Sequence, residues 1–308
     1  METGFRHDAV LYAGERDFVE RMARFARDAV RSDEPILVMV RGDKVEGLRA
    51  ELGSDADRVT FADMSEIGRN PSRIISAWED FFLGEAKGRY ARGIGEPIWV
   101  GRSPEEIVES QRHESLLNLA FREVDGWLVC PYDVSGLDAG TIEEAHRSHP
   151  VIQENGSRHA SARFRDVVEA IPGAFDAPLE DAPPEREQLV FGERDLHELR
   201  AFVSSFASRA GLPRPRAEDA VVAVSELASN SIRHGGGEGT LLAWLDSGYL
   251  VAEVRDRGRI QQPLVGRLRP SVTAQGGFGL WLVNQLSDLV QIRTYPTGSV
   301  VRVRFRLR

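Results

Sequence analysis

A proline-rich, acidic stretch divides this 308-residue chain into two parts. It runs over residues 175–187 and reads Phe-Asp-Ala-Pro-Leu-Glu-Asp-Ala-Pro-Pro-Glu-Arg-Glu. Three prolines and clustered carboxylates cannot continue a helix or a central strand, so the stretch is typical of an exposed, semi-stiff linker. A long surface loop within one domain is the alternative interpretation. Because domains average about 150 residues, we predict domains over 1–174 and 188–308.

Composition narrows the class of protein. The chain is 42% hydrophobic and 28% charged, which is enough to fill two cores, and its net charge is −9. Such an acidic surface repels phosphate groups, so we expect no direct nucleic-acid contact. No apolar run approaches the roughly 18 residues that a membrane span needs, and no leader pattern is visible. The single cysteine, Cys130, cannot close an intrachain disulfide. We therefore expect a cytoplasmic protein that does not contact membranes.

Short apolar runs alternate with amphipathic stretches in the first part. The stretch from Glu15 to Arg31 places apolar residues at steps of three and four, and Pro104 with two glutamates is typical of a helix start. Buried strands are predicted at 9–13, 35–40, 59–62, 97–100 and 127–130. This alternation predicts a three-layer α/β sandwich with a mainly parallel sheet.

The second part orders its elements differently. Two helices are predicted first, and strands, a glycine- and proline-rich loop, a further helix and two closing strands follow. The predicted ranges are 196–210 and 216–233 for the first helices, 239–245 and 249–255 for the strands, and 279–289 for the last helix. Elements grouped in this way favour a two-layer α+β fold with helices on one face of a mixed or antiparallel sheet.

Three short motifs in the second part contain residues that could bind a metal ion, an adenine ring or phosphate. Glu226 and Asn230 are four residues apart, so they project from one helix face and can share the shell of a divalent ion. Asp256 ends an apolar strand before the Gly258 turn, where its carboxylate could accept a hydrogen bond from an adenine amino group. The run 276–279, Gly-Gly-Phe-Gly, precedes a helix, where free backbone N–H groups favour phosphate. Each motif alone is more often a solvated helix face, an ordinary strand end or a simple turn.

In order and spacing, the three motifs together resemble the N, G1 and G2 boxes of the Bergerat-fold (GHKL) ATP-binding domain. The short form in the RsbW/SpoIIAB-like anti-sigma-factor serine kinases is most similar, over roughly residues 188 to 308. The resemblance implies ATP and Mg²⁺ as cofactors, with Glu226 as general base, Asn230 as Mg²⁺ ligand and Asp256 as adenine reader. The other nucleotide-binding positions that it implies are Gly258, Gly277, Gly279, Leu280 and Ser299.

The resemblance also implies partners. The γ-phosphoryl group would pass to a serine or threonine of a STAS-type anti-anti-sigma factor, and a sigma factor would be held inactive by binding. Kinase domains of this type commonly pair, which is compatible with a homodimer, although no residue pattern in the chain indicates one.

One position departs from the family pattern. Ile260 stands where the G1 box usually has its second glycine, and a β-branched residue there should stiffen the lid candidate, residues 261–275. Within that segment, Arg267 and Arg269 are better interpreted as solvent-facing than as phosphate contacts. Because the G1 box is altered, a non-catalytic, ATP-responsive anti-sigma binding module stays open as an alternative. A histidine kinase is less favoured, because the span before the boxes offers only the proline-rich stretch and one short helix bearing His197.

The first part resembles the MEDS sensory domain, a RecA/KaiC-like α/β class without a phosphate loop. Three segments carry the likeness: 92–99, 111–118 and 130–133. Together with the kinase part, the chain resembles RsbA-type anti-sigma regulators, and an unidentified small-molecule or hydrocarbon-like signal is implied. The residues predicted to surround that ligand are Glu96, Trp99, His113, Cys130, Tyr132 and Asp133, several of them at expected strand ends.

Cys130 has a second possible role. With His113 and the His146-x-x-His149 pair it could bind zinc or another soft metal. The sequence favours a simpler interpretation, a buried neutral thiol and ordinary histidines at a helix end.

Overall fold

The computed structural model describes residues 4–166, 178–270 and 277–307. The chain divides into two compact units, Met1–Ala170 and Ile171–Arg308. Within the described ranges, no helix combines the length and the apolar character that crossing a lipid bilayer requires.

The first unit is built on a mainly parallel sheet. Its described strands pair in the order β3-β2-β4-β5-β1-β6-β7, and every pair is parallel except β6 with β7. Short 3₁₀ or π turns lie at Gly53–Arg58, Pro71–Arg73 and Asp80–Glu85. The elements are β1 (Phe5–Tyr12), α1 (Gly14–Arg31), β2 (Ile36–Val40), α2 (Gly42–Leu52), β3 (Thr60–Asp63), α3 (Met64–Ile67), α4 (Ile74–Glu79), β4 (Ala91–Gly95), α5 (Pro104–Ala120), β5 (Gly126–Asp133), α6 (Ala139–Ser148), β6 (Val151–Glu154) and β7 (Ser157–Ala160).

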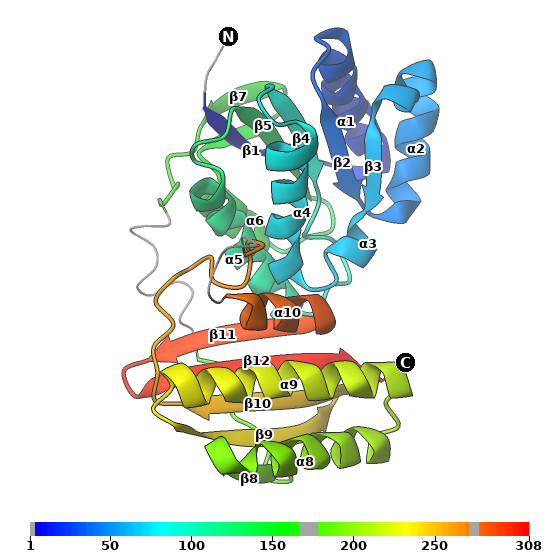
Figure 1. The fold of residues 1–308 in the computed structure, drawn as a ribbon. Helices are drawn as coiled ribbons and strands as arrows, with labels where there is room; N and C mark the ends of the chain where they lie inside the picture. Colours follow the sequence, from blue (N-terminus) through cyan, green and yellow to red (C-terminus); the bar gives the residue numbers. More distant parts are fainter. Residues whose placement is uncertain (1–3, 167–177, 271–276, 308) are drawn as a thin grey trace. The chain divides into compact units, whose positions relative to one another are not determined.

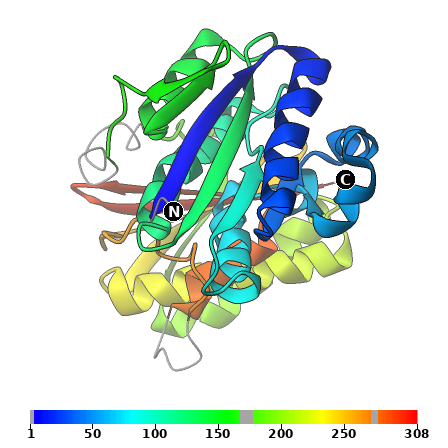
Figure 2. The ribbon, with the colours of Figure 1, turned by 90° about the horizontal axis from the view of Figure 1, so that it is seen from above.

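Helices cover both faces of this sheet. Figure 1 shows α1 and α2 on one face and α4, α5 and α6 on the other. The stripe on α1 is buried against the sheet through Phe18 and Met22, as its spacing predicts. Figure 2 shows β1 beside β5, and their parallel register pairs Ala9 with Cys130. The predicted three-layer α/β class is therefore confirmed for this unit.

The fourth strand lies earlier in the sequence than predicted. The sequence suggests a strand at 97–100, whereas β4 is Ala91–Gly95. Two glycines lower the intrinsic strand propensity of that run. They are nevertheless required, because a Cβ at Gly93 would lie 2.7 Å from the ring of Trp78 and one at Gly95 would lie 2.9 Å from it. The packing of the buried Trp78 therefore accounts for both glycines of this strand.

The second unit is a two-layer α+β fold, as predicted. Its described strands form the order β11-β12-β10-β9-β8, and all of these pairs are antiparallel. Figure 1 shows the long helices α8 and α9 against this sheet. The elements are β8 (Glu187–Gly192), the 3₁₀ turn Glu193–Asp195, α8 (Leu196–Arg209), α9 (Arg214–His234), β9 (Glu238–Asp246), β10 (Tyr249–Asp256), α10 (Phe278–Leu286), β11 (Leu289–Tyr295) and β12 (Gly298–Arg306).

The described part of the predicted linker packs against this unit. Ala182 is 8% exposed and joins Leu242, Trp244 and Val251 in a small apolar cluster. The backbone carbonyl of Glu180 accepts a hydrogen bond from Arg302 at 2.6 Å. Residues 178–186 are therefore attached to the second sheet, and β8, which the sequence did not predict, begins directly after them.

Candidate functional site

A cleft of about 870 Å³ lies in the second unit between α9, the turn after β10 and the start of α10. Three segments from separate parts of the sequence meet there. The sequence-predicted residues that line the cleft are Glu226, Asn230, Asp256, Gly258, Gly277, Gly279 and Leu280.

One wall of the cleft is the face of α9 that carries Glu226 and Asn230. Both side chains are half-buried and lie one helical turn apart. The start of α10 approaches this face so closely that a Cβ at Gly279 would lie 2.7 Å from Glu226 Oε2. A larger residue at position 279 would therefore displace the glutamate from the cleft.

The opposite wall is the N-terminus of α10. Gly277 caps this helix with a φ of 90°, in the left-handed region that glycine adopts without strain. The first turn of a helix leaves backbone N–H groups without intrahelical partners, and the helix dipole adds partial positive charge. This end of the cleft is therefore suited to an anion such as phosphate.

Asp256 is held at the end of β10 by two hydrogen bonds. Its Oδ2 accepts from the Ser231 hydroxyl at 2.7 Å, and its Oδ1 accepts from the Gly258 N–H at 2.8 Å. Sequence reasoning missed Ser231, which is 1% exposed. Nothing in the sequence separates it from Ser225 and Ser229 on the same helix, whose hydroxyls donate to backbone carbonyls of that helix.

Ser299 supports the cleft from behind. It pairs with Asp256 across β10 and β12 and is 3% exposed. Its hydroxyl donates to the Gly258 carbonyl at 2.9 Å and accepts from the Ile260 N–H at 3.3 Å. Unlike the other predicted nucleotide-binding residues, Ser299 does not line the cleft. Its hydrogen bonds hold the turn that follows Asp256.

In the first unit, Glu96 lies directly after β4 and is 1% exposed. It accepts a hydrogen bond from the Tyr12 hydroxyl at 3.0 Å and pairs with the Lys44 ammonium group, which also donates to Tyr12 at 2.7 Å. Burial raises the pKa of Glu96, and Lys44 offsets part of that effect. Asp133, which pairs with Tyr12 across β1 and β5, accepts hydrogen bonds from the Gly14 N–H at the start of α1 and from the Ser135 N–H in the turn after β5.

The other predicted ligand residues of the first unit lie elsewhere. Trp99 is half-buried, with the Arg102 guanidinium 3.8 Å from its ring centroid. His113 is buried within α5. Cys130 and Tyr132 lie two residues apart on β5 and therefore on the same face of that strand. Tyr132 packs edge-on against His149. The six residues predicted to surround one ligand are therefore not brought together at a single site.

Two protein families match the chain. Residues 6–150 match MEDS, the MEthanogen/methylotroph, DcmR Sensory domain. Residues 192–305 match the histidine kinase-like ATPase domain. The chain joins a MEDS domain to a histidine kinase-like ATPase domain.

One similar solved structure contains the RsbU and RsbW domains of Rv1364c from Mycobacterium tuberculosis. It is 20% identical, with a TM-score of 0.31, over 41% of this chain and 33% of that chain. This chain therefore spans about a third of that structure's length. Among curated proteins, no sequence matches the chain.

The lid candidate of the ATPase domain lies partly outside the described residues, which omit 271–276. Its described part is anchored to α10, because Asn284 donates to the Gly266 carbonyl at 2.7 Å. Arg269 is exposed, as the sequence suggests, but Arg267 is only 5% exposed, so its expected solvent-facing position is wrong. The turn that carries Arg267 folds inward against α10, which the sequence alone did not reveal.

Ile260 is held at both of its backbone polar groups. Its N–H donates to Ser299, and its carbonyl accepts from the Thr294 hydroxyl at 3.1 Å. Its side chain packs against the main core of the ATPase domain and also lines the cleft. The start of the lid segment is therefore hydrogen-bonded to β11 and β12 and packed against the core.

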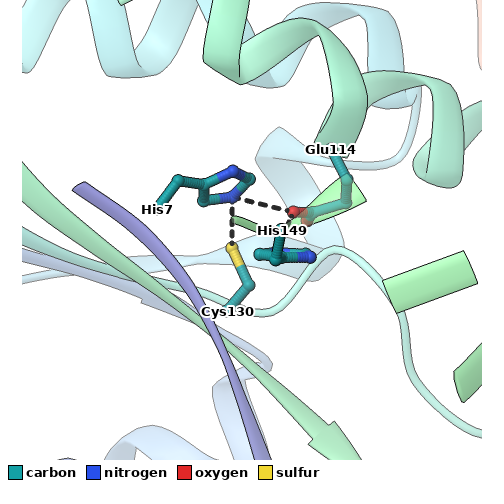
Figure 3. Close-up of side chains that lie close together, drawn as sticks. All are labelled: His7, Glu114, Cys130 and His149. Atoms are coloured by element: carbon teal, nitrogen blue, oxygen red, sulfur yellow. Dashed lines mark hydrogen bonds and ion pairs between the residues drawn. The ribbon is translucent and has the colours of Figure 1, made fainter. Parts of the chain in front are cut away.

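The MEDS domain holds a buried cluster of four polar side chains, shown in Figure 3: His7, Glu114, Cys130 and His149. His7 Nε2 lies 3.2 Å from Glu114 Oε2 and 3.4 Å from Cys130 Sγ, and His149 Nε2 lies 3.0 Å from Glu114 Oε2. Burial raises the pKa of the Cys130 thiol and lowers that of His7. The sequence suggested Cys130 and His149 as metal ligands, whereas the other suggested histidines, His113 and His146, are not members of the cluster. Glu114 was not suggested as a ligand, and His7 was missed, since no motif links the first strand to the others.

Proposed function

We propose that the chain is a cytoplasmic anti-sigma regulator. Its ATPase domain binds Mg²⁺ and ATP and transfers the γ-phosphoryl group to a serine or threonine of a STAS-type anti-anti-sigma factor. A sigma factor is the second partner, held inactive by binding. The observation that carries the proposal is the convergence of Glu226, Asn230, Asp256 and the α10 N-terminus on one cleft.

The side chains present suit this nucleotide. Mg²⁺ prefers a few oxygen ligands from the protein alongside phosphate oxygens, and Asn230 offers an amide oxygen one turn from Glu226. Gly277 and Gly279 leave the backbone at the start of α10 open to phosphate. When bound, Mg²⁺-ATP supplies the transferable phosphoryl group and neutralises part of the charge that develops during transfer.

The cleft residues have separate roles in this proposal. Asp256 accepts a hydrogen bond from the adenine amino group, and Ser231 and Gly258 hold its carboxylate in position for that contact. The α10 N-terminus binds the phosphates. Glu226 accepts the proton of the incoming serine or threonine hydroxyl as its oxygen bonds to phosphorus and ADP departs, which requires an approach of about 3 Å.

The MEDS domain is the input in this proposal. A small-molecule signal bound there would change the activity of the ATPase domain only if it binds two conformations of the chain with different affinity. The net charge of −9 suits a regulator that contacts a basic, DNA-binding partner without contacting DNA itself.

Glu226→Ala tests the proposed chemistry. The variant should lose phosphoryl transfer by about 10²- to 10⁴-fold, the range for a general base, and should still bind ATP. Radiolabelled ATP and a candidate anti-anti-sigma substrate measure transfer, and a fluorescent nucleotide measures binding. Glu218→Ala is the matched control, because Glu218 lies on the same helix but is exposed and pairs with Arg214. Wild-type turnover by Glu226→Ala would contradict the assignment.

A second candidate function rests on Ile260. Its anchored backbone favours an ATPase domain that binds nucleotide and a sigma factor but phosphorylates nothing. The two functions differ in one measurement on the wild-type protein. Transfer of radiolabel to a partner supports the kinase, whereas ATP-dependent binding of a sigma factor without any transfer supports the non-catalytic module.

A further inference from the structure

Four electron-pair donors converge in the MEDS domain from four separate segments. His7 comes from β1, Glu114 from α5, Cys130 from β5, and His149 from the residue after α6. Their ligand atoms lie within 4.8 Å of one another, and all four side chains are buried. Figure 3 shows the side chains directed toward one another. The cluster thus lies between the sheet and the layer of helices that contains α5 and α6.

The hydrogen bonds around the cluster determine which histidine nitrogens face it. Asn118 donates its amide to the Ser148 carbonyl at 2.8 Å, so its Oδ1 is the atom that faces His7 Nδ1, 3.1 Å away. His7 must therefore carry a proton on Nδ1. His149 Nδ1 lies 2.9 Å from the Ala145 carbonyl, which only accepts, so it is protonated as well. In the neutral rings, both Nε2 lone pairs point into the cluster.

This arrangement leaves the centre of the cluster short of positive charge. Two imidazole nitrogens lie 3.0 and 3.2 Å from the Oε2 atom of Glu114, and the Cys130 sulfur lies within 4.8 Å of a carboxylate oxygen. The Oε1 atom has no hydrogen-bond partner among the described residues. A fully buried carboxylate oxygen without a partner is costly, because nothing replaces its lost hydration. A cation bound at the centre would satisfy the carboxylate, both nitrogens and the sulfur together.

We propose that His7, Glu114, Cys130 and His149 bind a divalent transition-metal ion of the zinc class. Two imidazoles, one thiolate and one carboxylate are donors that Zn²⁺ takes in four-coordinate protein sites. Mg²⁺ and Ca²⁺ prefer oxygen, so the nitrogen and sulfur donors disfavour them.

The spacing of the donors fits such an ion. Metal–ligand bonds of about 2.0–2.3 Å in a tetrahedron separate the ligand atoms by about 3.3–3.7 Å. Three of the six pairs of ligand atoms lie 3.0 to 3.4 Å apart, and all six lie within 4.8 Å. Small movements of the side chains, outward for the short pairs and inward for the longer ones, would accommodate the ion.

The surrounding contacts also resemble those of metal sites. Histidine ligands commonly donate their second ring N–H to a carbonyl or carboxamide oxygen, which fixes the ring. Asn118 and the Ala145 carbonyl serve this purpose here. With four protein donors the coordination is complete, so the ion would join β1, β5, α5 and the end of α6 and stabilise the MEDS domain.

The single cysteine of the chain makes a decisive test possible. The full-length protein, purified under reducing conditions, should contain about one zinc ion per chain by elemental analysis. After exchange to Co²⁺, a thiolate-to-cobalt charge-transfer band in the near ultraviolet can come only from Cys130. Cys130→Ser should abolish that band, and Asn118→Ala should weaken metal affinity by about 10- to 100-fold through loss of ring positioning.

Two histidine variants are matched controls. His146→Gln removes the other member of the His-x-x-His pair, which lies on α6 outside the cluster. His159→Gln removes an exposed histidine of β7. Both should keep the wild-type metal content and the cobalt band, whereas His149→Gln should lose them.

Three results would overturn the proposal: wild-type protein that neither contains zinc nor binds added Zn²⁺ or Co²⁺, a cobalt band that persists in Cys130→Ser, or equal metal loss in His146→Gln and His149→Gln. X-ray absorption at the zinc edge of the wild-type protein keeps the test independent of how any variant folds. One sulfur neighbour together with nitrogen and oxygen neighbours supports the site, and the absence of sulfur contradicts it.

Discussion

The cleft of the ATPase domain and the cluster of the MEDS domain bring polar side chains together in opposite ways. In the cleft, half-buried side chains come from short motifs, with Glu226 four residues before Asn230 and Asp256 two before Gly258. In the cluster, His7 is 107 residues from Glu114 and 123 from Cys130, and all are buried. An open cleft with glycines suits a ligand that enters and leaves, whereas an enclosed set of side chains suits an ion that stays.

Removing the proposed metal should have the largest effect, and only on the MEDS domain. An ion present at a thousand times its dissociation constant stabilises the folded state by about 4 kcal/mol. Chelation should therefore increase hydrogen–deuterium exchange in β1 and β5, and nucleotide affinity should stay unchanged. Equal exchange with and without chelator would remove the proposed difference between the two sites, and a change in nucleotide affinity would show that they are coupled.

Asp256→Asn should have the next largest effect, and only on the ATPase domain. The amide keeps the shape of the side chain, but the carboxylate that would accept from adenine is lost. A hydrogen bond to a charged group contributes about 1.5–3 kcal/mol, so ATP affinity should fall by about 10- to 150-fold in a fluorescence titration. Asp181→Asn, at an exposed aspartate, is the control. Unchanged affinity would argue against adenine recognition by Asp256.

Ser231→Ala should have a smaller effect on the same carboxylate. Loss of one hydrogen bond to Asp256 should lower the free energy of unfolding by about 1 kcal/mol and weaken ATP binding modestly. The Ser229 hydroxyl donates to a backbone carbonyl of its own helix, so Ser229→Ala should leave ATP affinity at the wild-type value. Equal affinities in the two variants would indicate that Ser231 does not position Asp256.

Ile260→Gly should have the smallest effect on ATP affinity. Its effect on stability should exceed the roughly 0.5–1 kcal/mol that follows from the backbone freedom of glycine, because the substitution also removes a side chain packed against the core. The informative measurement is the rate of nucleotide release. A loosened start of the lid segment should increase that rate in a stopped-flow displacement experiment. Arg259→Gly adds freedom at an exposed neighbour and should change release less. If both variants release nucleotide at the wild-type rate, the anchoring of Ile260 does not control the lid.

Much of the ATPase cleft could be predicted from sequence because its motifs are local. A four-residue helical spacing places Glu226 and Asn230 on one face wherever the helix lies, and the run of glycines identifies the start of α10. Ser231 and the inward position of Arg267 could not be predicted in this way. Both depend on which side of a helix or turn meets a neighbouring element, and no local pattern records that.

In the MEDS domain, the alternation of strands and helices correctly predicted a mainly parallel sheet between helices. The position of β4 was missed, because its two glycines, which the packing of Trp78 requires, lower the local strand propensity. His7 was missed for a similar reason. Its partners are set by the pairing of β1 between β5 and β6, a long-range arrangement.

The sequence alone therefore determined the two folds, their order along the chain and the residue types of the ATPase cleft. Backbone periodicity and short motifs act over a few residues and are visible in the linear order. Only the tertiary structure decided that Cys130, a solitary thiol in the sequence, lies beside two histidines and a glutamate. Sheet pairing and helix packing bring together residues more than a hundred positions apart, and their geometry depends on the whole core rather than on any one segment.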